Sequence, residues 1–382
     1  MQKHFCIPLA GVLASFSLAA HASNPPTWQI ENVARASAGN RKVTLKVTPD
    51  QRVHLAYTGC TDDVCDNAVL EYAVREPGAN GTWSKTIVDD SHHATGWFSS
   101  MVITPSQAVH ILYSNHYGKP MLQHAILQPG KAWTTDKVSN IPGGYWISTE
   151  LSGDQILMSS TAFPKNDLDH PQLEFGTFGG DEWAFEKLDD SEEAGWLTAL
   201  AVDNQGQPVI SYVRHNYPEG DLMVTHRDTG NQWKTDLLDH TSVKSDLAVD
   251  RDGFIHVVYQ KYDPNSETDM RDLMYATNSP DGAWHTQILD GAQDVLEDTG
   301  GHPHITIDAN GTKHVSYSDE RGLKLMYARQ FAGADWETFS VTPKKSDCYY
   351  SWVEADNLGG VHIACDTGRE IHYAYCADCG IQ

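Results

Sequence analysis

Short runs of alternating apolar and polar residues, separated by turn sequences, recur along the whole chain. One unit of this pattern contains Ser245–Asp250, the turn Arg251–Gly253, Ile255–Tyr259, Leu273–Ala276 and the turn Pro280–Gly282 before Trp284. Alternation with β-branched and aromatic residues predicts strands, and Asp and Gly at fixed places predict tight turns. Each unit therefore predicts four short antiparallel strands.

A tryptophan marks every unit and gives the repeat its register. Seven of them lie 55, 50, 50, 50, 51 and 52 residues apart: Trp28, Trp83, Trp133, Trp183, Trp233, Trp284 and Trp336. Four-stranded units repeated in this way are typical of the blades of a propeller. We predict an all-β fold, a seven-bladed β-propeller, and assign the marker tryptophans to packing at the blade turns.

The two ends of the chain are expected to meet in one blade. The last unit predicts three strands, Ser351–Asp356, Val361–Cys365 and Glu370–Tyr375, before the chain ends. Its missing outer strand is supplied by Trp28–Val33, which pairs an otherwise open sheet edge. We expect residues 23–382 to form a single propeller domain.

The first 22 residues have the pattern of a secretory signal peptide. Lys3 precedes an apolar run from Phe5 to Ala20, and Ala20 and Ala22 frame a small-residue cleavage site. No later run approaches the roughly 18 apolar residues of a membrane span. We expect a secreted or periplasmic protein without a membrane span.

Six cysteines follow the leader, and an exported chain favours disulfides. Local spacing favours Cys60 with Cys65, Cys348 with Cys365, and Cys376 with Cys379. A zinc site on Cys376 and Cys379 lacks a second ligand pair at matching spacing. The spacing supports neither structural zinc nor structural calcium, and no cofactor can be named.

The charge balance limits the choice of partners. The chain carries 27 Lys and Arg against 51 Asp and Glu, a net charge of −24. Such an acidic protein is a poor ligand for nucleic acid. We expect a monomer that binds a carbohydrate or polysaccharide.

Candidate functional residues lie in two sets of loops that share one face of the predicted ring. These are the links between blades and the loops between second and third strands. Their non-repeated aromatic and basic residues suit sugar rings and their hydroxyl or carboxylate groups. We assign substrate binding to Trp97, Tyr117, Tyr145, Trp146, Trp196, Arg271, Arg321 and Tyr349.

Another set of histidines repeats with the blades and is expected to be structural. These residues stand three positions before a Tyr or Cys in the second strand: His54, His110, His256, His314 and His362.

The Ser279-x-Asp281-Gly282-x-Trp284 turn resembles a shortened Asp-box. The repeated region resembles secreted propellers that include sialidases, lectins and polysaccharide lyases. Ulvan-degrading propeller lyases are similar in placing a histidine in an inter-blade link, another about twenty residues on, and a tyrosine and arginine nearby. That resemblance implies catalytic roles for His93, His116, Arg214 and Tyr217, with His215 beside them. This chain has His92-His93-Ala-Thr-Gly-Trp97 where those enzymes have Asp-x-His-x-x-Pro.

Three functions remain open from the sequence. A lyase on a uronate polysaccharide needs a base, an acid and a carboxylate neutraliser, which His, Tyr and Arg can supply. A non-catalytic glycan- or protein-binding propeller would use the same aromatic face. A glycoside hydrolase needs two carboxylates, for which Asp189, Asp190, Glu192 and Glu193 qualify by type.

Overall fold

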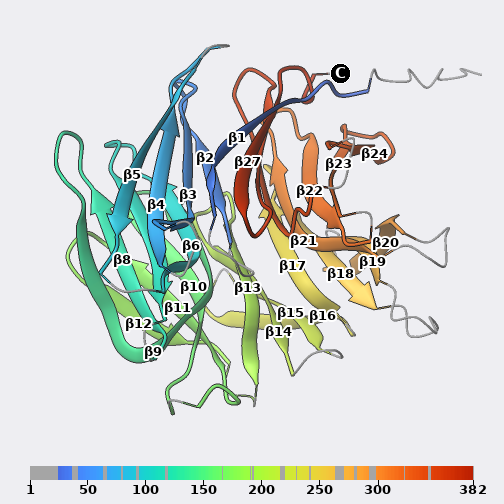
Figure 1. Cartoon of the computed structure of the whole chain (residues 1–382). Helices are drawn as coiled ribbons and strands as arrows, with labels where there is room; N and C mark the ends of the chain where they lie inside the picture. The colour runs from blue at the N-terminus through green and yellow to red at the C-terminus, as the bar shows by residue number, and fades with distance from the viewer. Residues whose placement is uncertain are drawn as a thin grey trace, which may run out of the picture.

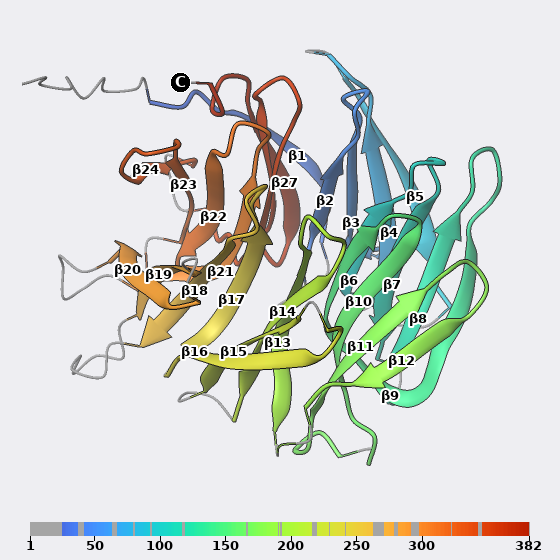
Figure 2. The ribbon, with the colours of Figure 1, turned by 180° about the vertical axis from the view of Figure 1, so that it is seen from behind.

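A computed structural model of the chain describes residues 25–36, 42–62, 67–78, 81–91, 94–116, 119–165, 167–189, 191, 193–215, 220–228, 230–240, 242–262, 271–278, 282–291, 298–321, 323–342 and 346–381. The predicted signal peptide lies outside these residues. Figure 1 and the reverse view in Figure 2 show strands radiating around a central axis. No membrane-spanning helix is found in the described part of the chain.

Each blade contributes four strands that run outward from the axis, each antiparallel to its neighbour. The inner strands are β2 (Thr44–Val47), β6 (Thr95–Ile103), the second half of β9 (Thr134–Ser152), β13 (Ala194–Val202), β17 (Ser242–Val249), β21 (Thr299–Ile307) and β25 (Tyr350–Ala355). The second strands are β3 (Val53–Cys60), β7 (Val109–Asn115), β10 (Gln155–Ala162), β14 (Pro208–Arg214), β18 (Ile255–Tyr262), β22 (Lys313–Asp319) and β26 (Val361–Asp366).

The outer half of each blade follows the same order. The third strands are β4 (Ala68–Arg75), β8 (Met121–Leu127), β11 (Gln172–Phe178), β15 (Asp221–Arg227), β19 (Arg271–Asn278), β23 (Lys324–Gln330) and β27 (Glu370–Cys376). The outermost strands are β5 (Trp83–Asp89), the first half of β9, β12 (Trp183–Lys187), β16 (Trp233–Asp239), β20 (Trp284–Asp290), β24 (Glu337–Ser340) and β1 (Gln29–Arg35).

Seven blades close into one ring. Each inner strand contacts the inner strand of the next blade, from β2 through β25 and back to β2. The N-terminal strand β1 pairs antiparallel with β27, from Gln29 opposite Tyr375 to Arg35 opposite Glu370. The predictions of a seven-bladed propeller and of closure by the N-terminal strand are confirmed.

One strand belongs to two blades. The first half of β9 pairs with β8 in blade two, and its second half pairs with β10 in blade three. These blades therefore form one seven-stranded sheet, where the other blades are separate four-stranded sheets.

The marker tryptophans pack between neighbouring blades, as predicted. Trp133 of blade two meets Tyr72 of blade one edge to face, with ring centroids 5.3 Å apart. Trp83 of blade one meets Tyr373 of blade seven in the same way, also at 5.3 Å. Such edge-to-face pairs add to the apolar burial between blades.

The repeated histidines are buried and hydrogen-bonded. In blade seven, His362 Nδ1 lies 2.7 Å from the Tyr373 hydroxyl, and its Nε2 lies 3.0 Å from Asp356 Oδ2 in the turn after the first strand. The same three-residue link recurs in blades five and six. These histidines join the turn to the third strand, which agrees with a structural role.

Two of the three predicted disulfides are present. Cys348 is bonded to Cys365 and Cys376 to Cys379, and all four residues are buried. The predicted partner of Cys60, Cys65, lies outside the described residues. Disulfides of this kind are typical of proteins that fold in an oxidising compartment.

Candidate functional site

The inner strands of four blades begin with the same irregularity. A glycine with positive φ is followed two positions later by a non-glycine residue with positive φ, and the ladder to the second strand shifts register there. The pairs are Gly96 with Phe98, Gly144 with Trp146, Gly195 with Leu197, and Gly300 with His302. At Gly96, a Cβ would lie 2.8 Å from the Leu70 Cα, so glycine is required for the close approach of the chains. Such double bulges redirect the residue between the two strained positions.

The residue between the strained positions defines a ring around one end of the axis. In these four blades it lies opposite the next-to-last residue of the second strand, and the equivalent position in the repeat identifies its counterparts in blades five and seven. From blade two to blade seven these residues are Trp97, Tyr145, Trp196, Lys244, Gly301 and Tyr350. The aromatic residues at this position are therefore Trp97, Tyr145, Trp196 and Tyr350, and Trp146 stands one position further along, the place that His302 holds in blade six.

His116 lies between two of these rings. Its imidazole stacks on Trp97, with centroids 4.1 Å apart, and on Tyr145, with centroids 4.7 Å apart. The Tyr145 hydroxyl lies 3.4 Å from His116 Nδ1. Burial raises the pKa of Tyr145, so its hydroxyl stays protonated at neutral pH. An imidazole and a phenol in contact can act as a base and an acid.

This stack changes what Trp97 and Tyr145 can offer a sugar. Each ring presents one face to His116, so one face at most is open to a ligand. Phe163 contacts Tyr145 with centroids 5.1 Å apart and Trp196 with centroids 6.0 Å apart, and so extends the aromatic arc across blades two to four.

A pocket of about 310 Å³ opens at the same end of the axis. We call it the loop mouth; its lining residues are Trp146, Trp196, Leu197, Val213, His215, Ser242, Val243, Lys244, His302 and Tyr350. Three predicted site residues, Trp146, Trp196 and His215, are therefore brought together here. The pocket narrows toward the centre into a cavity of about 70 Å³ between Trp146, Leu197, His302 and Tyr350.

A charged group replaces the aromatic arc on the opposite side of the ring. Lys244 Nζ donates to Glu320 Oε1 at 2.9 Å, and Arg271 donates to Glu320 Oε2, also at 2.9 Å. Arg271 also donates to the Tyr262 hydroxyl at 2.8 Å. The absent side chain of Gly301 makes room for this carboxylate, because a Cβ there would lie 2.4 Å from Glu320 Oε1. Burial lowers the pKa of Lys244 despite this partner.

The remaining predicted site residues are distributed around this face. Arg214 forms an ion pair with Asp221, 3.6 Å apart, and does not line the loop mouth. Arg321 and Tyr349 are exposed at the rim. His93, Tyr117 and Tyr217 lie outside the described residues, as do Asp190 and Glu192. Asp189 accepts a hydrogen bond from the Tyr212 hydroxyl at 2.6 Å, a link that recurs between other blades, so its carboxylate has a structural partner.

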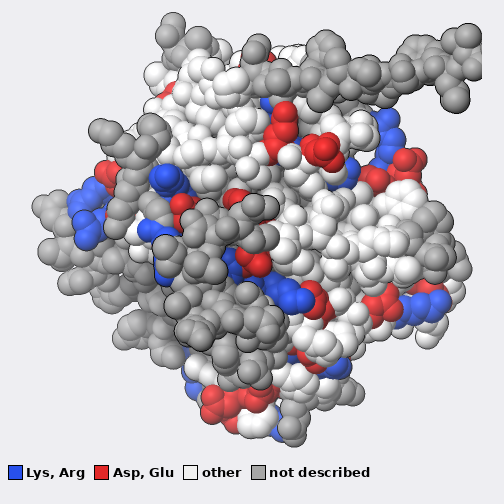
Figure 3. All heavy atoms as spheres, turned by 90° about the vertical axis from the view of Figure 1, so that its right-hand side faces the viewer, with Lys and Arg blue, Asp and Glu red and all other residues white. Residues whose placement is uncertain are grey.

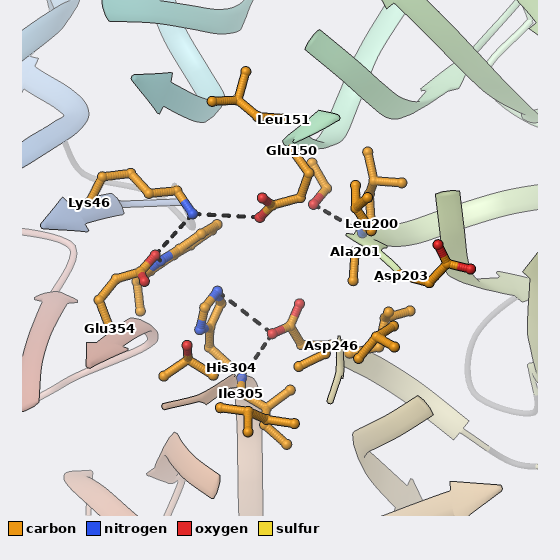
Figure 4. Close-up of a pocket in the computed structure, with 18 residues that line it drawn as sticks. Lys46, Glu150, Leu151, Leu200, Ala201, Asp203, Asp246, His304, Ile305 and Glu354 are labelled. Carbon is orange, nitrogen blue, oxygen red and sulfur yellow. Dashed lines mark hydrogen bonds and ion pairs between the residues drawn. The ribbon is translucent and has the colours of Figure 1, made fainter. Parts of the chain in front are cut away.

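The opposite end of the axis has a different lining. This turn mouth is a cavity of about 440 Å³ lined by the last residues of the inner strands, among them Lys46, Glu150, Asp246, His304 and Glu354 (Figure 4). Lys46 Nζ lies 2.9 Å from Glu354 Oε1 and 3.5 Å from Glu150 Oε1. Asp246 accepts the Ile305 N–H at 2.8 Å. Burial raises the pKa of Asp246 to about 7.

His304 is also fully engaged at the turn mouth. Its Nδ1 accepts the Val353 N–H at 3.4 Å, which places its proton on Nε2, 3.6 Å from Asp246 Oδ2. Burial lowers the pKa of His304 well below its ordinary value. No group of three or more His, Cys, Asp or Glu side chains is placed to hold a metal ion within the described ranges.

Charged side chains on one face of the molecule do not gather by sign. In the view of Figure 3, described basic and acidic groups lie beside one another rather than in separate patches.

Sequence reasoning did not select Lys244, Ser242 or Glu320 as site residues. Lys244 follows no motif, but it holds the same place in the repeat as Trp97 and Trp196. An alignment of the seven units that allowed for the bulges would have found it.

Comparisons with known proteins show the fold. No family model matches the chain, and no curated protein matches it. An ulvan lyase bound to -[GlcA(1-4)Rha3S]- superposes with a TM-score of 0.64 at 11% identity, covering 91% of this chain and 95% of that one. A further polysaccharide lyase gives 0.58 at 11% identity, covering 95% and 94%. The Aleuria aurantia lectin, in complex with a fucosylated sugar, gives 0.51 at 13% identity, covering 80% and 97%. The chain shares its propeller architecture with proteins that cleave or bind carbohydrates.

Proposed function

We propose that the protein is a carbohydrate-active propeller, and specifically a polysaccharide lyase that acts on a uronate-containing polymer. The observation that carries this proposal is the contact between His116 and Tyr145 at the face where the loops meet. Architecture alone does not give an activity, so this pair of side chains is the basis for the reaction class. The lyase neighbours support the choice of reaction class.

The reaction assigned to the pair is a β-elimination. His116 takes the proton from the carbon next to the uronate carboxyl group. The electron pair forms a carbon–carbon double bond, and the bond to the glycosidic oxygen breaks. Tyr145 donates its hydroxyl proton to that oxygen, and its raised pKa favours the protonated form that is needed. Arg214 and His215 are the proposed neutralisers of the substrate carboxylate.

The test is to incubate the protein with alginate, pectate, ulvan and glycosaminoglycans and to follow the absorbance of unsaturated products at about 235 nm. Removal of a general acid or base lowers the rate by roughly a hundredfold or more. We expect this loss for His116→Gln and for Tyr145→Phe. Tyr375→Phe, in β27 of blade seven, is the matched control and should retain the rate of the unchanged protein. The lyase assignment is wrong if none of these polymers yields products.

A non-catalytic glycan-binding propeller is the second candidate. The observation that favours it is the recurrence of Trp97, Tyr145 and Trp196 at one register position in three successive blades. Binding on a glycan array without turnover, abolished by Trp196→Ala and retained by His116→Gln, would select this candidate.

A further inference from the structure

Several polar side chains at the loop mouth have no hydrogen-bond partner. Tyr350 is 5% exposed, and its hydroxyl has no partner among the described residues. Within the same part of the chain, neither ring nitrogen of His302 is hydrogen-bonded. The hydroxyl of Ser242 and the indole N–H groups of Trp146 and Trp196 are buried and unpaired as well. Buried polar groups are paired in the great majority of cases, so this concentration around one pocket requires an explanation.

Unpaired polar side chains are not a common property of the two mouths of the channel. At the turn mouth the principal polar side chains, Lys46, His304 and Glu354, all have partners within the protein. Unpaired indole N–H groups also occur away from the channel, at Trp28, Trp284 and Trp336, so the loop mouth is distinguished by the fact that its unpaired groups line a pocket.

The lining of the loop mouth also selects the charge of a ligand. Lys244 is the one Lys or Arg among its described lining residues, and no Asp or Glu occurs there. Glu320 takes one of the three N–H groups of this ammonium, which leaves donors for a second acceptor. In a chain with a net charge of −24, a pocket with this lining favours an anion.

Size and shape restrict the ligand further. About 310 Å³ lies at the lower end of the range for small-molecule sites. The inner end narrows to a cavity of about 70 Å³, which leaves room for one small ligand at the loop mouth. Trp146 and Trp196 supply apolar walls beside the polar groups, an arrangement that suits the two kinds of surface on a sugar ring.

We propose that the loop mouth binds a single small hydroxylated carboxylate, a sugar acid, with its carboxylate on Lys244 and its hydroxyl groups on Tyr350 and His302. Glu320 is a positioning residue that holds the Lys244 ammonium at the wall of the pocket. Only the choice of a sugar acid within the class of small hydroxylated carboxylates rests on the proposed function. The unpaired groups and the charge are independent of it.

The test is isothermal titration calorimetry of the full chain at low ionic strength with D-glucuronate and with D-glucose. The two probes differ in the carboxylate, and a charge-assisted hydrogen bond corresponds to roughly a tenfold or greater difference in affinity. We expect glucuronate to bind at least about tenfold more tightly than glucose. Equal affinity for the two probes, or binding of neither, overturns the proposal without any variant being needed.

Substitutions then assign the preference to individual residues. Lys244→Met should remove the preference for glucuronate. Tyr350→Phe should lower the affinity for both probes by about threefold to tenfold. The matched controls are Lys131→Met, at an exposed position, and Tyr375→Phe, and both should bind as the unchanged protein does. Circular dichroism confirms that each variant is folded. A preference that survives in folded Lys244→Met also overturns the proposal.

The outcome is separate from that of the lyase assay. Binding of glucuronate without cleavage of any polymer supports the pocket and removes the lyase assignment. Cleavage of a polymer that depends on His116 and Tyr145, without binding of glucuronate, supports the lyase assignment and removes the proposed pocket.

Discussion

The loop mouth and the turn mouth are two ends of one channel, built from the same seven inner strands, yet they treat polar groups in opposite ways. At the turn mouth, an ammonium lies between two carboxylates, and a histidine is fixed on both sides. At the loop mouth, the hydroxyl, indole and imidazole groups are unpaired within the described structure. Pairing inside the protein indicates a structural contribution, whereas unpaired groups around a pocket indicate a place for a ligand.

His302 and His304 show this difference on one strand. They are two residues apart in β21, and burial lowers the pKa of both well below the ordinary value. His302 stacks on Tyr350 without a hydrogen bond, and His304 bridges a backbone N–H and Asp246. The type of residue and the degree of burial are therefore the same, and only the partners differ.

Acidification should lower the free energy of unfolding more than any single substitution, because it acts on the histidines of both mouths and of the blades together. Burial lowers the pKa of His54 and His110 to about 4 and that of His124 to about 3. Their folded pKa lies below the unfolded value of about 6.5, so their contribution to stability is complete above that pH and is lost as the pH falls toward about 4. Between its unfolded and folded pKa values, each such histidine lowers the free energy of unfolding by about 1.4 kcal/mol for every pH unit of acidification.

Urea denaturation at pH 7 and at pH 5 measures this loss, which should amount to several kcal/mol. Substitution of the exposed His170 by Gln should leave the pH dependence unchanged. A free energy of unfolding that is the same at both pH values would contradict the lowered pKa values.

Among the single substitutions, Lys46→Met should lower the free energy of unfolding most. It removes the cation between Glu150 and Glu354 and leaves two carboxylates facing the same cavity. Loss of one partner from a buried pair lowers stability by about 3–5 kcal/mol, and the partial exposure of these side chains reduces the expected loss to about 2–3 kcal/mol. Chemical denaturation checks it, with Lys131→Met as an exposed control that should change by less than about 0.5 kcal/mol.

Substitution of the two histidines by phenylalanine compares the mouths directly. His304→Phe leaves the Val353 N–H without its acceptor, which should lower stability by about 1–3 kcal/mol. His302→Phe breaks no hydrogen bond of the described structure and should change stability by less than about 1 kcal/mol. Thermal unfolding of both variants is the measurement, and equal losses would remove the distinction between the mouths.

Glu320→Gln should have the smallest effect and should sharpen the assignment of charge at the loop mouth. Without this carboxylate, the positive charge of Lys244 is less compensated, so glucuronate should bind about twofold to threefold more tightly, a change of roughly 0.5 kcal/mol. Calorimetry with Glu76→Gln as the exposed control checks it. Weaker binding of glucuronate to the variant would show that positioning of Lys244 outweighs its charge.

The sequence predicted the ring because strand alternation, turns and marker tryptophans repeat in every blade. Closure by residues 28–33 followed from the same register, and the pairs Cys348–Cys365 and Cys376–Cys379 followed from the spacing of the cysteines. The loop face also selected His116, which stacks on Trp97 and Tyr145, and Trp146 and Trp196, which line the loop mouth; their roles stay predictions. These features depend on local spacing, which can be read along one chain.

The geometry of the pocket could not be predicted in the same way. The double bulges at Gly96 and Gly144 turn Trp97 and Tyr145 onto His116, whereas the sequence suggested open platforms for sugar rings. Lys244 reaches the axis only because seven inner strands converge there. Such convergence depends on contacts between blades about fifty residues or more apart in the chain.

The continuous strand β9 has a mechanical consequence for the two residues assigned to catalysis. His116 follows the second strand of blade two, and Tyr145 lies within β9 where that strand enters blade three. Elsewhere in the described structure, adjacent blades are separate four-stranded sheets with no strand in common. Here an unbroken backbone carries both halves, so relative sliding of these two blades would strain the polypeptide itself. The imidazole and the phenol thus lie at the one described blade junction that a single strand crosses, and an insertion after residue 142 should disturb their alignment more than one of equal length at any other blade junction.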